Sequence, residues 1–408
     1  MDNKKKRVYK NALSLVVLQG SNYLAPLILL PYLARIFTLN DYGVYAFVIA
    51  MTQTAYVLTD FGFNLYGTNY VARHRDNNKK ISRFIGGVFL IKLILLIVAS
   101  VSVIVFSLIC DKYNNYTGIF AASVLIIIGQ AFQFFWFFQG IEKMKFIVLN
   151  TGVGKLLLLL LTLIFVTSTD DLLKAILING LSQVITALMS FIMVIKNGYK
   201  ISLPGFNYMW KLAASSSSYF YSRIAVSFYT SFATIFVGLV MPVSQVAIFS
   251  LPDQACKAMR SLVQPIAQAL YPYMSREKDT KFLHKIVAIS SISSVVLGIA
   301  TIYLAPHLIV FFFGDKWGEC VLIFRLFVIV FIVSVPSVLL GYPMMAAIGK
   351  PKAANYSVMF GVAVYVPVLF LLWLLDLVSL VNMVLVILLT ESVVLSVRLY
   401  YTRRYKIS

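Results

Sequence analysis

The stretch SSSSYFYSRIAVSFYTSFATIFVGLV, residues 215–240, decides the fold class. Its first part is rich in serine, as a loop would be, but no Asp, Glu, Lys or Arg follows Arg223 until Asp253. A transmembrane helix needs roughly 20 mostly apolar residues, so residues 215–239 are long and apolar enough to cross a bilayer. Arg223 then lies near the middle of the span, where its insertion costs about 2.5–3.5 kcal/mol. The sequence therefore raises the question of what keeps an arginine there.

The rest of the chain has the same apolar character. Of its 408 residues 60% are hydrophobic and 12% are charged, and the mean hydropathy is +0.88, which excludes an ordinary soluble globular protein. In hydrocarbon every backbone N–H and C=O must be paired, and these apolar segments are too long for barrel strands. We therefore predict an all-α integral membrane protein with about 12 transmembrane helices. The predicted spans are 11–34, 42–63, 84–109, 116–138, 146–167, 173–195, 212–238, 243–270, 286–313, 321–345, 354–375 and 378–400.

The net charge of +20 is distributed unevenly along the chain. Most basic residues lie in the N-terminal tail, in the connections after even-numbered spans and at the C-terminal end. The opposite side of the membrane has only Arg35, Lys112, Lys174 and Lys316. The positive-inside rule then places both termini in the cytoplasm, and the charge needs no nucleic-acid partner to explain it. We expect no removable signal peptide, and we expect the cysteines to be unpaired.

The chain divides into two similar halves. Six predicted spans precede the polar connection around 196–211, which contains Pro204-Gly205, and six follow it. The sequence YAF at 45–47 is echoed by AIF at 247–249, and each is followed by a basic turn. We predict two six-helix lobes, residues 1–200 and 201–408, as parallel repeats related by a pseudo-twofold axis along the membrane normal. Such folds place the substrate path between the halves.

The sequence gives no sign of an enzyme. The external connections are all short, whereas a membrane glycosyltransferase or polymerase needs a sizeable loop to build its site. The GVGK sequence at 152–155 lies inside a span and lacks the spacing of a phosphate-binding loop. With three histidines and no close grouping of His, Cys and carboxylates, we expect no metal and no cofactor.

Nine charged residues lie within the predicted spans and more than two positions from either end, and the basic ones outnumber the acidic ones. Buried ionisable groups in membrane proteins tend to face a bundle interior and to mark a transport path. An excess of cations indicates that the transported molecule is an anion. The basic residues are Lys92, Lys155, Arg223, Lys257, Arg260 and Arg325, and the acidic ones are Asp60, Asp253 and Glu391.

The seventh predicted span has a polar face. Tyr219, Arg223, Ser227, Thr230 and Thr234 recur at i, i+3/i+4 spacing and share one side of a helix. We interpret this stripe as lining a lumen. A seam between two packed helices is the alternative, because serine and threonine allow close approach, but a seam does not explain Arg223.

Span eight places Asp253, Lys257 and Arg260 on one face. Asp253 and Lys257 form either a neutralised pair or part of a site. If they form a neutralised pair, Arg260 is left over and is the better ligand for an anion. Lys92 and Lys155 either bind substrate or pair with carboxylates.

Asp60 and Glu391 either balance a basic neighbour or carry a coupling proton. In span four, Gln130 and Gln133 suit sugar hydroxyls, with Trp136 as an aromatic face beside them; an interfacial aromatic belt is the alternative.

Four sequence motifs are similar to those of a known family. They are LPYLARIFTLNDYGVYAF (30–47), LTDFGFNLYGT (58–68), FFQGIEKMKF (137–146) and YPYMSRE (271–277). The chain resembles the polysaccharide transporter family, the Wzx-type O-antigen and capsule repeat-unit flippases, most densely over its first 150 residues. The resemblance implies the two-lobe fold of the multidrug/oligosaccharidyl-lipid/polysaccharide flippase superfamily. Cationic lumen residues are a theme of that family, and Arg223, Lys257 and Arg260 fit it.

The resemblance also implies a function. The substrate would be an oligosaccharide on polyprenyl diphosphate, turned from the cytoplasmic to the external leaflet of the bacterial cytoplasmic membrane, with a polysaccharide polymerase and a chain-length regulator as possible partners. A cation-coupled multidrug exporter of the same superfamily is the main alternative, and it would favour carboxylates in the lumen. A sugar symporter with another twelve-helix fold is disfavoured, because ARHRDNNKKISR (72–83) is not its Gly-Asp-Arg-Gly-type loop.

Overall fold

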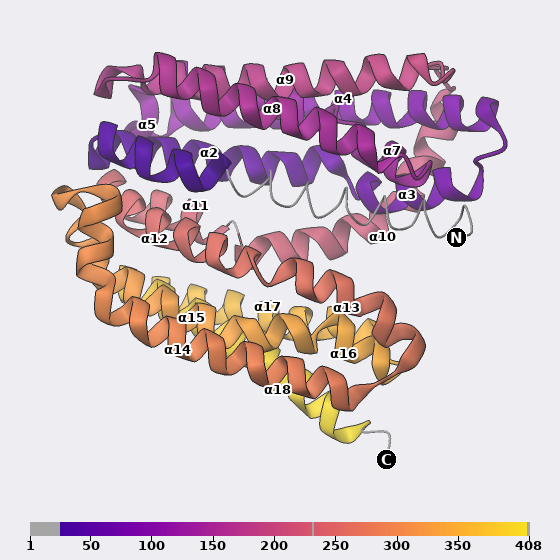
Figure 1. Ribbon diagram of the computed structural model, residues 1–408. Coiled ribbons are helices and arrows are strands. Elements are labelled where there is room, and N and C mark those ends of the chain that lie inside the picture. Colours follow the sequence, from indigo (N-terminus) through magenta and orange to yellow (C-terminus); the bar gives the residue numbers. More distant parts are fainter. Residues whose placement is uncertain (1–24, 231, 406–408) are drawn as a thin grey trace. The chain divides into compact units, whose positions relative to one another are not determined.

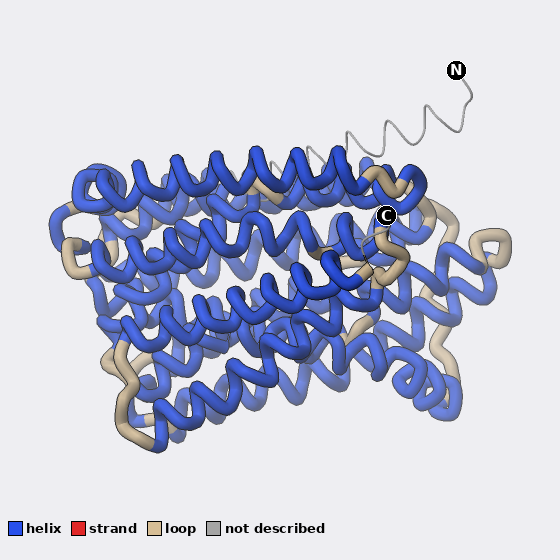
Figure 2. Tube along the Cα trace, turned by 90° about the horizontal axis from the view of Figure 1, so that it is seen from below, coloured by secondary structure: helices blue, strands red, loops and turns tan. Residues whose placement is uncertain are grey.

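The computed structural model describes residues 25–230 and 232–405, without the side chains of 222, 225–230, 269 and 272 (Figure 1). Over these residues the chain is helical and contains no strand, which confirms the predicted all-α fold class. Figure 2 shows that the loops gather at the ends of the long helices. Cys110, Cys256 and Cys320 are all free, as the sequence predicts.

Nine helical segments of the described residues are long and apolar enough to cross a membrane. Three predicted spans are not among them. The span 11–34 begins in residues outside the described part, and the helix Ala25–Ile36 is the portion that is described. The spans 212–238 and 243–270 form helices, but their serines and charged residues lower the hydropathy. The count of 12 and the cytoplasmic placement of both termini therefore stay predictions.

The chain forms two compact units. The first comprises residues 25–29 with Val44–Ser227, and the second comprises Leu30–Gly43 with Phe228–Ser408. The helix α10 (Phe206–Thr230) thus packs almost entirely with the first unit. The predicted lobes, residues 1–200 and 201–408, describe two repeated halves of the sequence and not these compact units, so that division stays a prediction.

The first unit is built around an aromatic core. Phe63, Phe84, Trp136, Phe137 and Phe138 are all buried within it. The contacts join α6 to α9, α8 to α9, α4 to α6 and α3 to α7. Its helices are α2 (Leu39–Asp60), α3 (Phe63–Arg73), α4 (Asn78–Ile109), α5 (Asp111–Asn114), α6 (Thr117–Ala131), α7 (Phe135–Gly140), α8 (Met144–Phe165), η1 (Thr169–Asp171), α9 (Leu172–Lys196) and α10.

The second unit has an aliphatic and methionine-rich core. Phe331, Leu339, Met344 and Met345 are buried there. The contacts join α14 to α15, α15 to α18, α17 to α18, α12 to α15 and α13 to α16. Its helices are α11 (Phe232–Val240), α12 (Val243–Ser261), α13 (Gln264–Glu277), α14 (Thr280–Phe313), η2 (Asp315–Trp317), α15 (Cys320–Leu340), α16 (Tyr342–Ala347), α17 (Lys352–Leu374) and α18 (Leu380–Arg404).

Each unit contains two interrupted spans in corresponding positions. In the first, α2 gives way to α3 and α6 gives way to α7; in the second, α12 gives way to α13 and α15 gives way to α16. Pro265 and Pro343 lie in the first turns of α13 and α16, where the missing N–H is tolerated. No proline marks the two breaks of the first unit. The shared pattern supports the predicted repeat.

Residues 30–43 belong to the second unit and bond to the loop between α14 and α15; we name this segment the outer tether after its predicted side of the membrane. Arg35 donates hydrogen bonds to the carbonyls of Phe311 and Phe312, and Lys316 Nζ donates to Arg35 O at 2.9 Å. Trp317 Nε1 donates to Ala34 O at 2.9 Å. These bonds hold the segment 30–43 on the loop between α14 and α15.

Candidate functional site

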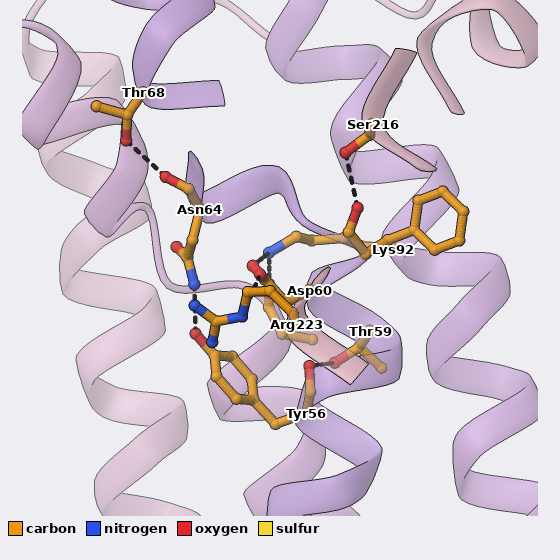
Figure 3. A network of polar contacts seen from close by, with 10 residues as sticks. Tyr56, Thr59, Asp60, Asn64, Thr68, Lys92, Ser216 and Arg223 are labelled. Carbon is orange, nitrogen blue, oxygen red and sulfur yellow. Dashed lines mark hydrogen bonds and ion pairs between the residues drawn. The ribbon is translucent and has the colours of Figure 1, made fainter. Parts of the chain in front are cut away.

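The candidate site is a charged cluster at the break between α2 and α3. Asp60, the last residue of α2, is completely buried. Its Oδ1 lies 3.7 Å from Lys92 Nζ and its Oδ2 lies 3.9 Å from Arg223 Nε (Figure 3). Neither carboxylate oxygen has a hydrogen bond among the described residues. One carboxylate therefore faces two cations, and the cluster has a net positive charge.

The break that positions Asp60 is held by α10. Phe61 and Gly62 both have positive φ angles, 46° and 77°, which are costly for a side chain larger than hydrogen. A Cβ on Gly62 would also lie 2.8 Å from the backbone nitrogen of Phe220, so glycine is required there. Phe61 is stabilised because its ring stacks on Phe220 at 4.5 Å and its carbonyl accepts a 2.7 Å hydrogen bond from Ser216 Oγ.

Lys92 has a structural explanation. Its Nζ donates a 2.9 Å hydrogen bond to the carbonyl of Ala131, the last residue of α6. The break before α7 leaves that carbonyl without its helical partner, and the C-terminal end of a helix attracts a cation. The side chain of Lys92 is only 4% exposed. Lys92 therefore joins the two helix breaks of the first unit and stabilises Asp60.

Arg223 is the accessible member of the cluster. Its side chain is 34% exposed and it pairs with Asp60 through Nε. Tyr56 and Asn64 lie beside its guanidinium in Figure 3, and Asn64 Nδ2 donates to Tyr56 Oη at 2.6 Å. The terminal guanidinium nitrogens have no partner among the described residues, so they remain able to bind an anion in a bidentate manner. Asp60 thus gives Arg223 a buried partner, which answers the question that the sequence raised.

The corresponding groups of the second unit form matched pairs. Lys257 Nζ lies 2.6 Å from Asp253 Oδ2, and Arg260 Nη1 donates to Glu391 Oε1 at 3.0 Å. The Asp253–Lys257 contact is the one that the neutralised alternative predicts. The prediction that Arg260 is left over is wrong, because Glu391 lies 131 residues away in sequence and the spacing along α12 gave no sign of it.

The embedded charges can now be assigned. Each of the three carboxylates has a basic partner, and Asp60 has two. Arg325 donates to the carbonyl of Ile302 at 3.1 Å, and Lys155 pairs with no carboxylate among the described residues. The positive excess of the spans thus resides at the Asp60 cluster, Lys155 and Arg325.

The predicted polar stripe is described only in part. Tyr219 packs against Tyr66 at 5.9 Å between ring centroids, and Thr234 is buried in α11. The side chains of Ser227 and Thr230 lie outside the described residues. The stripe as a lumen lining stays a prediction.

Gln130 and Gln133 line a polar cavity of about 430 Å³ in the first unit. Trp136 does not join them: it is 1% exposed and lies in the aromatic core. The break at residues 132–134 changes the helical register between the glutamines and the tryptophan, which a continuous span did not predict.

Tyr56 and Asn64 are the site residues that sequence reasoning missed. Each is four residues from Asp60, one on either side. For Tyr56, which lies on α2 with Asp60, that spacing is typical of neighbours on one helix face and was the available signal. Asn64 lies in α3, beyond the break at Phe61–Gly62, so helical spacing gives no signal for it.

A family model described as "Polysaccharide biosynthesis protein" matches residues 8–278, well over half of the chain. The chain belongs to this family. It is 29% identical over 277 residues to a protein of Escherichia coli (strain K12) named "Putative O-antigen transporter", a match that covers 67% of this chain and 66%, just under two thirds, of that protein. A protein of the same name from Shigella dysenteriae is 29% identical over 314 residues, 76% of this chain and 78% of its own length.

Two solved structures are similar in fold. The inward-facing conformation of a multidrug resistance MATE family transporter of the MOP superfamily has a TM-score of 0.71 at 14% identity, covering 97% of this chain and 98% of that one. The lipid II flippase MurJ, in an inward closed conformation, has a TM-score of 0.72 at 11% identity, covering 98% and 87%. At these identities the likeness shows the fold alone.

Proposed function

We propose that this protein is a flippase that moves polyprenyl-diphosphate-linked oligosaccharide repeat units from the cytoplasmic to the external leaflet of the bacterial cytoplasmic membrane. The product would serve O-antigen, capsule or exopolysaccharide synthesis. Membership of the polysaccharide biosynthesis family and the names of both relatives support this class of substrate. A polysaccharide polymerase and a chain-length regulator are the partners that such a pathway needs.

The observation that carries the proposal is the accessible guanidinium of Arg223 above a buried carboxylate that already has Lys92. A diphosphate is an anion whose desolvation requires a cation, and a guanidinium binds phosphate through two parallel hydrogen bonds. Because Lys92 stays with Asp60, Arg223 can transfer to a phosphate without leaving a buried carboxylate unpaired. Lys92 would thus support the site, while Arg223 contacts the substrate.

The membrane potential would assist this transport. Moving one charge through 100 mV changes the free energy by about 2.3 kcal/mol. With a negative interior, an anionic head group moves outward down the electrical gradient. Transport that does not respond to an imposed potential would contradict this part of the proposal.

Reconstitution in liposomes tests the proposal directly. A fluorescent polyprenyl-diphosphate oligosaccharide should move between leaflets with the wild type, and Arg223→Gln should lower the rate at least about tenfold, the loss expected for a charge-assisted hydrogen bond. Arg403→Gln, which removes an exposed arginine at the end of α18, is the matched control and should transport normally. A wild type that moves no lipid-linked sugar refutes the function.

A multidrug exporter of the same fold is the second candidate, favoured by the MATE-like structure. It requires carboxylates free to bind cationic drugs. Asp60, Asp253 and Glu391 are all paired with basic residues, which argues against it. Accumulation of cationic dyes against a proton gradient by the reconstituted protein would support it instead.

A further inference from the structure

The polar cavity of the first unit belongs to no site described so far. Its volume of about 430 Å³ lies within the range of about 300–1,000 Å³ that is typical of small-molecule sites. Helices α2, α6, α8 and α9 contribute to it. Amide and hydroxyl side chains dominate the wall, which is formed by Gln53, Tyr56, Gln130, Gln133, Phe135, Thr151, Gly154, Lys155, Ser182, Gln183 and Thr186.

Two polar atoms of the wall are buried without a partner among the described residues. They are Gln130 Oε1 and Thr151 Oγ1, and Thr151 as a whole is 8% exposed. Buried polar groups in proteins are almost always hydrogen-bonded, so these two atoms indicate a polar occupant. Gln133 Nε2 donates to Gln183 Oε1 at 2.7 Å, which fixes both amides in place. Each amide keeps further donor or acceptor capacity.

The charge in this cavity is positive. Lys155 lies one helical turn after Thr151 on α8, and the wall contains no Asp or Glu. No carboxylate of the described residues pairs with Lys155. An unpaired cation inside a membrane protein is costly unless an anion accompanies it. The occupant therefore combines hydroxyl groups with a negative charge.

The cavity adjoins the Arg223 cluster through Tyr56. This residue lines the cavity, and its hydroxyl accepts the hydrogen bond from Asn64 beside the guanidinium of Arg223. A ligand that has an anionic group at Arg223 can thus extend neighbouring groups into the cavity.

We propose that this cavity binds an acidic sugar of the glycan, with its carboxylate on Lys155 and its hydroxyls on Gln130, Thr151 and the glutamine pair. This inference rests on the proposed function and specifies its substrate. The carrier phosphate offers the same charge, but one lysine among so many amides and hydroxyls fits a carboxylated sugar better than a diphosphate. Glucuronic acid and its relatives are the chemical class.

Binding of soluble probes tests the inference without any transport step. The purified full chain in detergent is dialysed against radiolabelled glucuronosyl-glucose, glucosyl-glucose or inorganic diphosphate. The two disaccharides differ only in a carboxylate against a hydroxymethyl group. We expect the acidic disaccharide to bind about tenfold more tightly or better, because the lysine contact is charge-assisted.

Variants on α8 separate the charge from the hydroxyl contact. Lys155→Gln should remove the preference for the acidic disaccharide and leave the neutral one unchanged, while Lys145→Gln, at the exposed start of the helix, should keep it. Thr151→Val should weaken both disaccharides equally. Thr162→Val is its matched control, since Thr162 Oγ1 is also buried without a partner but lies outside the cavity. Lys155→Gln should fold normally, because it removes a half-buried charge that no carboxylate of the described residues pairs with.

Each contrary result overturns the inference. It fails if neither disaccharide binds, if both bind equally, or if Lys155→Gln lowers only the binding of inorganic diphosphate, which would assign the lysine to the carrier phosphate. These binding results are independent of the liposome assay. A wild type that binds the acidic sugar but moves no lipid-linked substrate would refute the proposed function alone.

Discussion

In the first unit one buried carboxylate faces two cations, whereas in the second unit each of two carboxylates faces one. Both arrangements lie next to an interrupted span: Asp60 ends α2, and Arg260 lies one residue before the end of α12. The end of the helix before the break thus holds an acid in the first unit and a base in the second. The amino-acid composition and the number of spans do not distinguish the Asp60 cluster from the ion pairs of the second unit.

We infer from this difference which charges stabilise the fold and which are available to bind a ligand. The charges of the two ion pairs in the second unit cancel. The first unit keeps a positive excess at the Asp60 cluster and at Lys155, which are linked through Tyr56. We infer that an anion binds chiefly to the first unit. The roles predicted for Arg260 and Lys257 in substrate binding stay predictions, and an experiment below tests that of Arg260.

The largest effect should come from Asp60→Asn. It leaves Lys92 and Arg223 buried or half-buried without their carboxylate, and removing one partner of a buried ionic group costs about 3–5 kcal/mol. Thermal unfolding in detergent measures the loss. Asp376→Asn, at an exposed turn with a positive φ that asparagine tolerates, is the control. Equal melting of both variants would show that Asp60 does not hold the cluster together.

Substitution of one glycine in each unit compares how tightly the helices of the two units pack. A Cβ on Gly129 would lie 2.6 Å from the backbone nitrogen of Val184, so α6 and α9 must separate. A Cβ on Gly298 would meet side-chain atoms alone, Ile332 Cδ1 at 2.5 Å and Cγ1 at 2.7 Å, with Val328 Cγ1 at 3.5 Å. We expect Gly129→Ala to lower the free energy of unfolding by about 1–3 kcal/mol. Gly298→Ala should stay within about 1 kcal/mol of the wild type, because alanine favours helix. The reverse order would contradict the assigned contacts.

A double substitution that leaves the net charge unchanged tests whether the second unit also binds the substrate. Arg260→Gln combined with Glu391→Gln removes a base and an acid together, so the second unit stays balanced. We expect this double variant to retain at least about half of the wild-type flipping rate, against the roughly tenfold loss of Arg223→Gln. If both fall equally in liposomes, Arg260 also binds the substrate, as the sequence alone suggested.

The smallest effect concerns the outer tether. Trp317→Phe removes the hydrogen bond to Ala34 but keeps an aromatic ring against Tyr42, whose ring centroid lies 5.0 Å away. The loss should be about 0.5–1.5 kcal/mol, the usual contribution of one hydrogen bond. Thermal unfolding of the variant beside that of Leu322→Ala, at an exposed position of α15, measures it. A loss above that range would show that the ring packing matters more than the bond.

Much of the fold follows from the sequence because hydrocarbon permits few backbone arrangements. The apolar stretches predict helices, and Pro265 and Pro343 accompany two of the helix breaks. The breaks at Phe61–Gly62 and at 132–134 have no such marker, since they depend on α10 and on Lys92. A continuous helix was therefore predicted through both.

The site was predictable as a set of residues but not as a set of pairs. The arginine in a span rich in serine drew attention to Arg223, and the excess of cations indicated an anion. Asp60 and Arg223 are separated by 163 positions, and Arg260 and Glu391 by 131. Which base meets which acid depends on how distant helices pack. That packing has no signal in local periodicity.

The outer tether also governs how this protein can be recombined with its relatives. Residues 30–43 pack with the second unit, although the first unit contributes the chain on both sides of them. A hybrid made with a single junction would therefore combine the segment 30–43 of one parent with the α14–α15 loop of the other. Exchange of substrate preference between homologues should need three junctions, near 29/30, 43/44 and 227/228, so that Arg35, Lys316 and Trp317 come from the same parent.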